Sequence, residues 1–373
     1  MQNTSRKSLM AVLLSSALVT GPSNAFASPS DQTQVEETAS TIAAMAPQSV
    51  PVVQGDLGIN ALEVIYEANG MQVGVNTATM AAKIQTVENI PAEEVAPGDL
   101  PVDDEPAGDN PVEDGPADTE PAAPAAAEAA SAVPLTMSPL RDGDQPQYIG
   151  EASDGSLVFE ETGAYSAVNT SVQFVEDGSV RYVNVIEDAS APTTFSYLLT
   201  VPSGGVAALG PDGDSVTVTD AAGALVGAVA APWARDAAGN DVPTHYGLVP
   251  VSATTVKLVQ TVDHDSDGVV YPVAADPYLG KALISKVTIG QRSGGTTLFV
   301  YPTLWMRANY NNPTVVNNLW YEYKSKVAAR YETTQLWWQL ACHVQAAPWK
   351  TSWNLDTWRY RTSYLSYVTH ACN

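Results

Sequence analysis

The 373-residue sequence is poor in the residue types that mark the commonest kinds of enzyme and membrane protein. It has two cysteines and four histidines, and neither a Ser-His-Asp set, nor a clear cluster of metal ligands, nor a pair of catalytic carboxylates can be read from it. Beyond the first twenty residues, no apolar run approaches the roughly eighteen residues that a membrane-spanning helix needs. We therefore expect no cofactor and no membrane span, and the sequence does not identify an enzyme.

Lysine and arginine are scarce in most of the chain. Residues 1–278 contain seven Lys and Arg against 38 Asp and Glu, whereas residues 279–373 contain ten against three. The formal net charge of −24 therefore combines −31 with +7. Seven of the eight tryptophans also lie in the basic part. This contrast predicts that residues 279–373 form a basic, Trp-rich unit with its own task.

The first 27 residues have the architecture of a cleavable signal peptide. Arg6 and Lys7 precede the apolar run Leu9–Val19, and Ala25-Phe26-Ala27 offers small residues at the two positions that a signal peptidase reads. This order of features argues against the alternative, a buried N-terminal helix. No cysteine lies near the junction, so a lipoprotein anchor is not indicated. We expect a mature protein that is secreted or associated with the cell wall.

The next two segments have little to bury. Residues 28–86 contain short apolar pieces, too few to predict an independent core, so we expect a weakly structured segment there. Residues 87–140 form an acidic Pro/Ala-rich stretch, because thirteen Asp and Glu and no basic residue lie between Lys83 and Arg141. Proline recurs there at every fifth position: Pro101, Pro106, Pro111, Pro116 and Pro121. Like charges and closely spaced prolines oppose packing, so we expect a disordered linker or stalk.

Residues 141–278 predict a mainly β domain, either an antiparallel sandwich or an open barrel. Runs rich in Val, Thr, Tyr and Phe predict strands at residues 180–186, 195–201, 216–219 and 255–262. Asp177-Gly178, Asp212-Gly213 and Ala222-Gly223 predict hairpin turns. The absence of long helical patterns argues against a parallel, nucleotide-binding sheet.

Residues 279–373 predict a small α+β domain. Two strands are expected at residues 284–289 and 297–301. Asn312-Pro313 is a helix cap and first-turn pair, and a second apolar helical face ends before Pro348. The aromatic tail from Trp349 lacks apolar periodicity, so another restraint must hold it.

The two cysteines supply that restraint. Cys342 and Cys372 are expected to form a disulfide in an oxidising compartment, worth roughly 3 to 4 kcal/mol for a loop of this length. The alternative, a catalytic thiol at Cys342 beside His343, requires a reduced cysteine and leaves Cys372 unexplained.

Two parts of the chain resemble uncharacterised modules. Cys342-His343, Lys350, the run Trp353-Asn354-Leu355-Asp356-Thr357-Trp358-Arg359 and Cys372-Asn373 resemble domain of unknown function 2599, found at the C-terminus of actinobacterial exported proteins. The resemblance covers residues 283–373 and implies a shared framework without an activity. Residues 231–237, 242–246 and 271–277 resemble a β module of such exported proteins, and Trp233 and His245 are expected to be core or turn residues in it.

The densest aromatic and cationic cluster of the chain lies in this last domain. Flat aromatic faces beside guanidinium groups suit sugar rings, bases or anionic polymers. We expect an anionic polymer or glycan of the cell envelope as the partner. The residues that we expect to bind it are Trp338, Trp353, Trp358, Arg359 and Arg361.

A secreted hydrolase is the alternative. The expected disulfide would bring His343 and His370 into one neighbourhood, with Lys350 nearby. Two histidines and a lysine are what a metal-independent ribonuclease-like toxin uses, and only this reading makes nucleic acid the partner. The binding interpretation is indifferent to both histidines.

One acidic loop resembles the start of a calcium site. Asp263, Asp265 and Asp267 are followed by Gly268, but the twelfth position is Ala274 instead of a bidentate Glu. A tight hairpin turn explains the same residues. We therefore predict no metal site, and calcium at these three aspartates is the weaker alternative.

The signal architecture predicts export with cleavage between Ala27 and Ser28. Intact-mass and N-terminal peptide measurements on protein from culture medium and cell wall should find Ser28 as the first residue. An unprocessed Met1 terminus in the cytoplasm would contradict the prediction.

Overall fold

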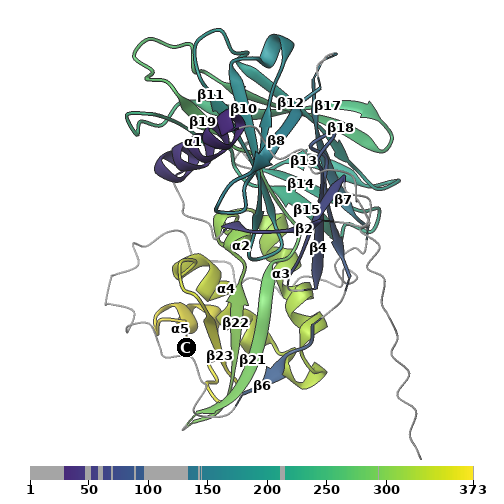
Figure 1. Ribbon diagram of the computed structural model, residues 1–373. Coiled ribbons are helices and arrows are strands. Elements are labelled where there is room, and N and C mark those ends of the chain that lie inside the picture. Colours follow the sequence, from purple (N-terminus) through teal and green to yellow (C-terminus); the bar gives the residue numbers. More distant parts are fainter. Residues whose placement is uncertain are drawn as a thin grey trace, which may run out of the picture.

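The computed structural model describes residues 29–46, 52–57, 62–68, 70–87, 90–95, 133–141, 143, 145–210, 215–292 and 294–372. The predicted signal peptide, most of the acidic linker and the Asp212-Gly213 turn lie outside these ranges. The described chain forms two lobes, a larger one dominated by strands and a smaller one that contains α2 (Leu304–Ala308), α3 (Pro313–Lys326), α4 (Thr334–Ala346) and α5 (Tyr364–Val368) (Figure 1).

The larger lobe contains two antiparallel sheets, as the sequence predicts. The first sheet has eleven strands. They are β1 (Val52–Val53), β8 (Gln147–Glu151), β9 (Leu157–Glu160), β10 (Val168–Val175), β11 (Val180–Ile186), β13 (Val206–Leu209), β14 (Val216–Thr219), β15 (Leu225–Val229), β16 (Ala234–Asp236), β19 (Val273–Ala275) and β20 (Tyr278–Gly280). The main order is β13-β14-β15-β20-β11-β10-β9-β8.

The second sheet has eight strands in the order β17-β18-β12-β7-β5-β4-β3-β2. They are β2 (Asp56–Leu57), β3 (Glu63–Ala68), β4 (Met71–Asn76), β5 (Ala82–Thr86), β7 (Leu135–Leu140), β12 (Thr194–Thr200), β17 (Thr244–Ser252) and β18 (Thr255–Val262). Both sheets contribute to one hydrophobic core, in which Tyr182 of the first sheet lies edge-on to Tyr197 of the second. The lobe is therefore a sandwich, with a 3-10 turn, η2 (Gly163–Tyr165), between β9 and β10.

Local sequence signals place several of these elements correctly. The predicted strands 180–186, 216–219 and 255–262 coincide with β11, β14 and β18, and the fourth lies within one residue of β12. The predicted Asp177-Gly178 turn joins β10 to β11, because Gly178 adopts a φ of 82° and the Asp177 carboxylate accepts the N–H of Ser179.

The smaller lobe is built on a four-stranded sheet in the order β23-β22-β21-β6. Its strands are β6 (Glu93–Glu94), β21 (Ile284–Arg292), β22 (Gly295–Pro302) and β23 (Trp353–Asp356), and a 3-10 turn, η3 (Ala329–Tyr331), separates α3 from α4. The predicted cap is confirmed, since the Asn312 side chain accepts the N–H groups of Thr314 and Val315 at the start of α3. In the ranges given above, no helix combines the length and the apolar character that crossing a bilayer requires.

The N-terminal segment is more ordered than its sequence predicts. α1 (Pro29–Met45) lies along the outer face of the first sheet, where Val35 and Ile42 are buried (Figure 1). β2 to β5 pair with one another in sequence order, whereas β1 and β5 also pair with strands much later in the chain, as Val52 does with Val175 and Ala82 with Met137. The short apolar runs of residues 28–86 cannot form a core alone, but they complete one that distant strands supply.

Both ends of the acidic stretch are attached to the fold. Before it, β6 pairs in parallel with β21, and the N–H of Val95 donates to the Ile289 carbonyl at 2.9 Å. After it, the Val133 carbonyl accepts from Lys281 Nζ at 2.9 Å, and β7 enters the second sheet. Residues 96–132 therefore connect two positions on one folded body.

The two lobes share a continuous apolar seam. Leu225 and Tyr278 of the larger lobe belong to the same buried cluster as Leu283, Trp305 and Leu319 of the smaller one. A buried carboxylate adds a hydrogen bond between the lobes, since Asp177 accepts from the backbone N–H of Trp305 at 3.1 Å. In the smaller lobe, Glu322 accepts the N–H groups of Leu283 and Ile284 at 2.8 and 3.0 Å, directly after the chain crosses the seam. The smaller lobe therefore depends on the larger one for part of its core.

Asp276 makes the stability of the larger lobe depend on pH. Burial raises the pKa of its carboxyl to about 8, although the Trp233 N–H donates to it. In an unfolded chain the pKa of Asp is about 3.9, so the folded protein retains a proton that the unfolded chain loses between these values. The unfolding free energy should therefore fall as pH rises from about 4 to about 8.

Asp276→Asn keeps the shape of the side chain and removes the titrating carboxyl group. Thermal unfolding of the wild-type protein at about pH 5 and about pH 7.5 should show a clear decrease of the midpoint, and the variant should show a smaller one. Identical pH dependence in the two proteins would contradict the assignment to Asp276.

Candidate basic surface of the C-terminal domain

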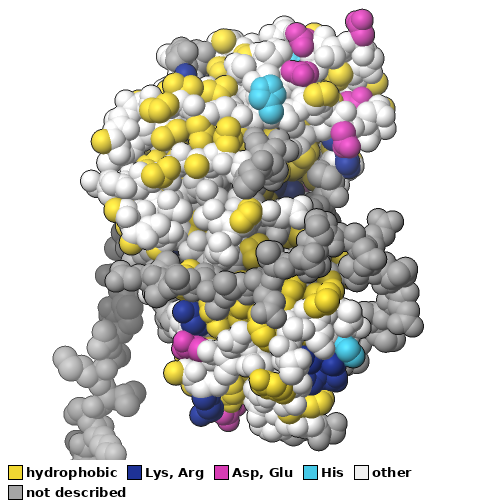
Figure 2. All heavy atoms as spheres, turned by 180° about the vertical axis from the view of Figure 1, so that it is seen from behind, with side chains coloured by type: hydrophobic (Ala, Val, Ile, Leu, Met, Phe, Trp, Pro, Cys, Tyr) yellow, Lys and Arg dark blue, Asp and Glu magenta, His cyan; other side chains and the backbone are white. Residues whose placement is uncertain are grey.

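Charge is segregated by burial in the smaller lobe, here called the C-terminal domain (residues 279–373). Of its three carboxylates, Glu322 and Asp356 are buried, whereas Glu332 is exposed. Eight cations are exposed or half-buried: Lys286, Arg292, Arg307, Lys324, Arg330, Lys350, Arg359 and Arg361. Exposed Glu93 and Glu94 of β6 offset some of this charge at the β21 edge. Figure 2 shows Lys and Arg side chains at several places on this domain.

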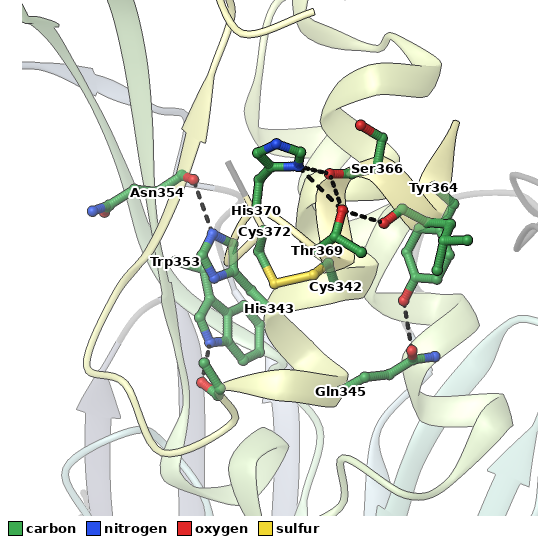
Figure 3. The surroundings of a disulfide bond; sticks show 12 residues. Cys342, His343, Gln345, Trp353, Asn354, Tyr364, Ser366, Thr369, His370 and Cys372 are labelled. Carbon is green, nitrogen blue, oxygen red and sulfur yellow. Dashed lines mark hydrogen bonds between the residues drawn. A yellow bond between two sulfur atoms is a disulfide. The ribbon is translucent and has the colours of Figure 1, made fainter. Parts of the chain in front are cut away.

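The expected disulfide is present. Cys342 of α4 is bonded to Cys372 in the tail that follows α5, with the two Cα atoms 5.4 Å apart (Figure 3). The Cys372 N–H donates to the Tyr367 carbonyl at 2.8 Å, which closes the end of α5. The aromatic tail is thus tied to the second predicted helix.

His343 and Gln339 form the next restraint. They lie one turn apart on α4, and both side chains are almost fully buried. His343 Nε2 lies 3.0 Å from the Asn354 carbonyl, and Gln339 bonds both the N–H and the carbonyl of Asp356 at 2.7 and 3.1 Å. These bonds satisfy backbone groups of β23 that β22 does not reach. The two α4 side chains therefore take the place of a further strand.

Asp356 connects this framework to the surface. Its side chain is 1% exposed, and its carboxylate accepts from Thr297 Oγ1 at 2.5 Å and from Arg359 Nε at 2.7 Å. The Arg359 side chain is 40% exposed. A buried carboxylate thus holds a guanidinium group at the edge of the domain.

Trp358 lies beside that guanidinium group. The Arg359 guanidinium carbon is 4.5 Å from the centroid of the Trp358 ring. The same ring packs on the β21–β22 turn so closely that a Cβ added at Gly294 would overlap it. Trp358 therefore supports Arg359, and much of its surface is already in contact with the protein.

Tyr367 fixes the loop that carries the cations. Its hydroxyl donates to the Arg359 carbonyl at 2.7 Å and accepts the Arg361 N–H at 3.2 Å. The ring is fully buried and lies 6.2 Å from the Trp338 ring. One side chain of the disulfide-bonded tail therefore sets the backbone on both sides of Tyr360.

The five residues expected to bind a ligand do not share one role. Trp353 is fully buried and donates its Nε1–H to the Ala347 carbonyl, so it belongs to the core and is removed from the binding set. Trp338 packs half-buried against Tyr367. Trp358, Arg359 and Arg361 lie on the surface loop between β23 and α5.

Two exposed aromatic residues were missed. Trp349 is 70% exposed and Tyr360 is 73% exposed, more than any other large hydrophobic residue of the described chain. Position gave a signal for each, because Trp349 directly follows Pro348 at a helix end and Tyr360 lies between two arginines. Aromatic residues at such places in a loop tend to remain outside a core.

The histidine pair does not form the arrangement that a ribonuclease needs. His343 is 2% exposed and faces the Asn354 carbonyl, whereas exposed His370 bonds the Ser366 carbonyl and Thr369 (Figure 3). A substrate phosphate cannot reach an imidazole buried in this way. Both histidines lie close to the disulfide, but only His370 faces solvent.

The acidic loop after β18 likewise lacks a metal cluster. Within the ranges that the structure describes, no three His, Cys, Asp or Glu side chains are arranged to hold a metal ion. His264, between Asp263 and Asp265, is buried and bonds Tyr271 and the Pro192 carbonyl. The loop thus packs around a histidine.

In the β module, Trp233 is half-buried and His245 is exposed.

The chain thus defines a two-lobed, mainly β protein whose small α+β domain is closed by one disulfide and carries a basic loop. Residues 284–373 match the family described as Protein of unknown function (DUF2599), so the C-terminal region is a domain of that family. Neither the curated proteins nor the solved structures that were compared contain a match to the chain. Within this domain, α4, which carries Cys342 and His343, bonds the Trp-Asn-Leu-Asp strand β23.

His343→Ala should destabilise the C-terminal domain, because it removes the bond from the buried imidazole to the Asn354 carbonyl and opens a cavity. The expected loss is about 2 kcal/mol in the free energy of unfolding. His370→Ala, the matched surface control, should change it by less than about 0.5 kcal/mol. Denaturant unfolding followed by Trp fluorescence measures both.

Equal stability of the two variants would contradict the structural role of His343. RNA degradation by the wild-type protein that His343→Ala abolished would instead support the hydrolase alternative.

Proposed function

We propose that this protein is exported and acts without catalysis, by binding an anionic phosphodiester polymer of the cell envelope through the basic surface of its C-terminal domain. The observation that carries the proposal is the segregation of charge. Two of the three carboxylates of the domain are buried, while eight cations are exposed or half-buried. Such a surface concentrates polyanions and releases their counterions on binding.

Contacts of the aromatic residues favour a polyol-phosphate polymer, of the teichoic type, over RNA. Unspecific binding of single-stranded RNA uses open aromatic faces on which bases stack. Trp353 and Trp338 are committed to internal packing, and Trp358 already contacts Gly294 and Arg359. Trp349 and Tyr360 are more exposed, but charge is the property that the surface offers throughout. A flexible polymer of phosphodiesters needs charge and no stacking platform.

The acidic segment is expected to compete with this ligand. It carries ten carboxylates within residues 96–132: Asp99, Asp103, Asp104, Glu105, Asp109, Glu113, Asp114, Asp118, Glu120 and Glu128. Its N-terminal end is attached to the basic domain through Val95, and its other end is attached at Val133 beside Lys281. This tethering gives the carboxylates a high effective concentration near the cations.

Arg359→Gln and Arg361→Gln should each weaken binding of the full chain to purified polyglycerol phosphate several-fold at low salt. Each should also lower the slope of log affinity against log salt by about one. Lys257→Gln, a matched charge loss in the larger lobe, should leave both quantities unchanged. Fluorescence titration at two or more salt concentrations gives these values.

A second arm replaces the ten carboxylates by Asn and Gln at constant chain length, which should raise the affinity. The full chain is used throughout because its C-terminal domain shares a core with the larger lobe. Absence of binding by the neutralised chain at low salt would disprove the proposal. Tighter binding to RNA than to polyglycerol phosphate would transfer it to nucleic acid.

A further inference from the structure

Arg359 differs from the other surface cations in how it is held. Its Nε donates to Asp356, whose carboxylate is itself fixed by Thr297. The backbone of Asp356 is bonded on both sides by buried Gln339. In the part of the chain that the structure describes, neither terminal nitrogen of Arg359 donates to a protein acceptor, and the side chain is 40% exposed. The guanidinium group is therefore anchored by its inner nitrogen alone.

The orientation of this group is fixed from two further directions. Trp358 lies beneath the guanidinium carbon at 4.5 Å and rests on the backbone of Gly294 and Gly295. The Tyr367 hydroxyl binds the Arg359 carbonyl, and the helix that carries Tyr367 leads into the disulfide at Cys372. Most of the rotamer freedom that an arginine loses on binding an anion is thus already lost before the ligand arrives.

We infer that Arg359 forms a defined subsite for one phosphodiester group, whose two non-bridging oxygens accept from the two terminal nitrogens of the guanidinium fork. The inference rests on the proposed function and adds a specific contact to it. A planar fork matches two oxygens of one phosphate, whereas an ammonium group offers only a point charge. The three surface lysines, Lys286, Lys324 and Lys350, contribute charge without this geometry.

Arg361 provides the matched comparison. It lies two residues further on the same loop and carries the same charge, but its guanidinium carbon is 6.0 Å from the Tyr367 ring centroid. Arg359 is held in addition by the buried Asp356 carboxylate, which accepts from its Nε at 2.7 Å. Replacement by lysine preserves charge at both positions and removes the fork.

The test compares Arg359→Lys with Arg361→Lys in the full chain with polyglycerol phosphate as the probe. Arg359→Lys should lose several-fold in affinity, close to the loss in Arg359→Gln, because charge alone does not restore the fork. Arg361→Lys should stay within about twofold of the wild-type value. Thermal unfolding of each variant shows whether the fold is retained.

Gly294→Ala tests the subsite without changing Arg359. The added Cβ would overlap the Trp358 ring, so the ring and the guanidinium above it must shift. Affinity should fall about as much as in Arg359→Lys, while the exposed turn keeps the unfolding midpoint near its wild-type value.

Wild-type affinity in Arg359→Lys, together with weak binding by both Gln variants, would overturn the subsite and leave the proposed function standing. Wild-type affinity in Gly294→Ala would overturn the supporting role of Trp358 and with it the defined geometry. If both Gln variants bound like the wild type, the proposed function itself would fail.

Discussion

The buried carboxylate of Asp356 is the interaction on which the surface of the C-terminal domain depends. The carboxylate accepts from Thr297 of β22 and from Arg359 of the surface loop. The backbone N–H of the same residue donates to Gln339 of α4. A carboxylate so deeply buried is stable only because each of its oxygens has a donor. The loop therefore inherits its geometry from the core. This gives a structural reason for the aspartate and the arginine three residues apart in the run Trp353–Arg359.

The same framework shows how the Cys-His and Trp-Asn-Leu-Asp residues of this domain pack. Cys342, His343 and Trp353 are buried, and each makes a bond that holds α4, β23 and the tail together. Among the motif residues, Trp358 and Arg359 reach the surface. A domain of about ninety residues has a small core, and one disulfide with several buried hydrogen bonds compensates for it. The framework thus displays the loop that carries Trp358 and Arg359.

Contacts between the lobes show that the acidic stretch, residues 96–132, does not separate two independent domains. A stalk separates two bodies, but here strands on both sides of residues 96–132 belong to the same fold, since β5 pairs with β7. β6 also links the N-terminal segment directly to the C-terminal domain. The described chain on both sides of residues 96–132 is therefore part of one folded body, and its N-terminal side lies at the β21 edge of the C-terminal domain.

Local patterns in the sequence by themselves determined the mainly β class, the positions of β11, β14 and β18, the Asn312 cap and the Cys342–Cys372 bond. These features depend on neighbouring residues, on turn chemistry or on there being only two cysteines to pair. Only the tertiary structure decided the fold of the described residues between 29 and 86, because β1 and β5 attach them to strands more than fifty residues away. It alone also decided that Trp353 and His343 are buried while Trp349 and Tyr360 are exposed. Side chains of one type look alike in a sequence, and their roles are set by which elements cover them.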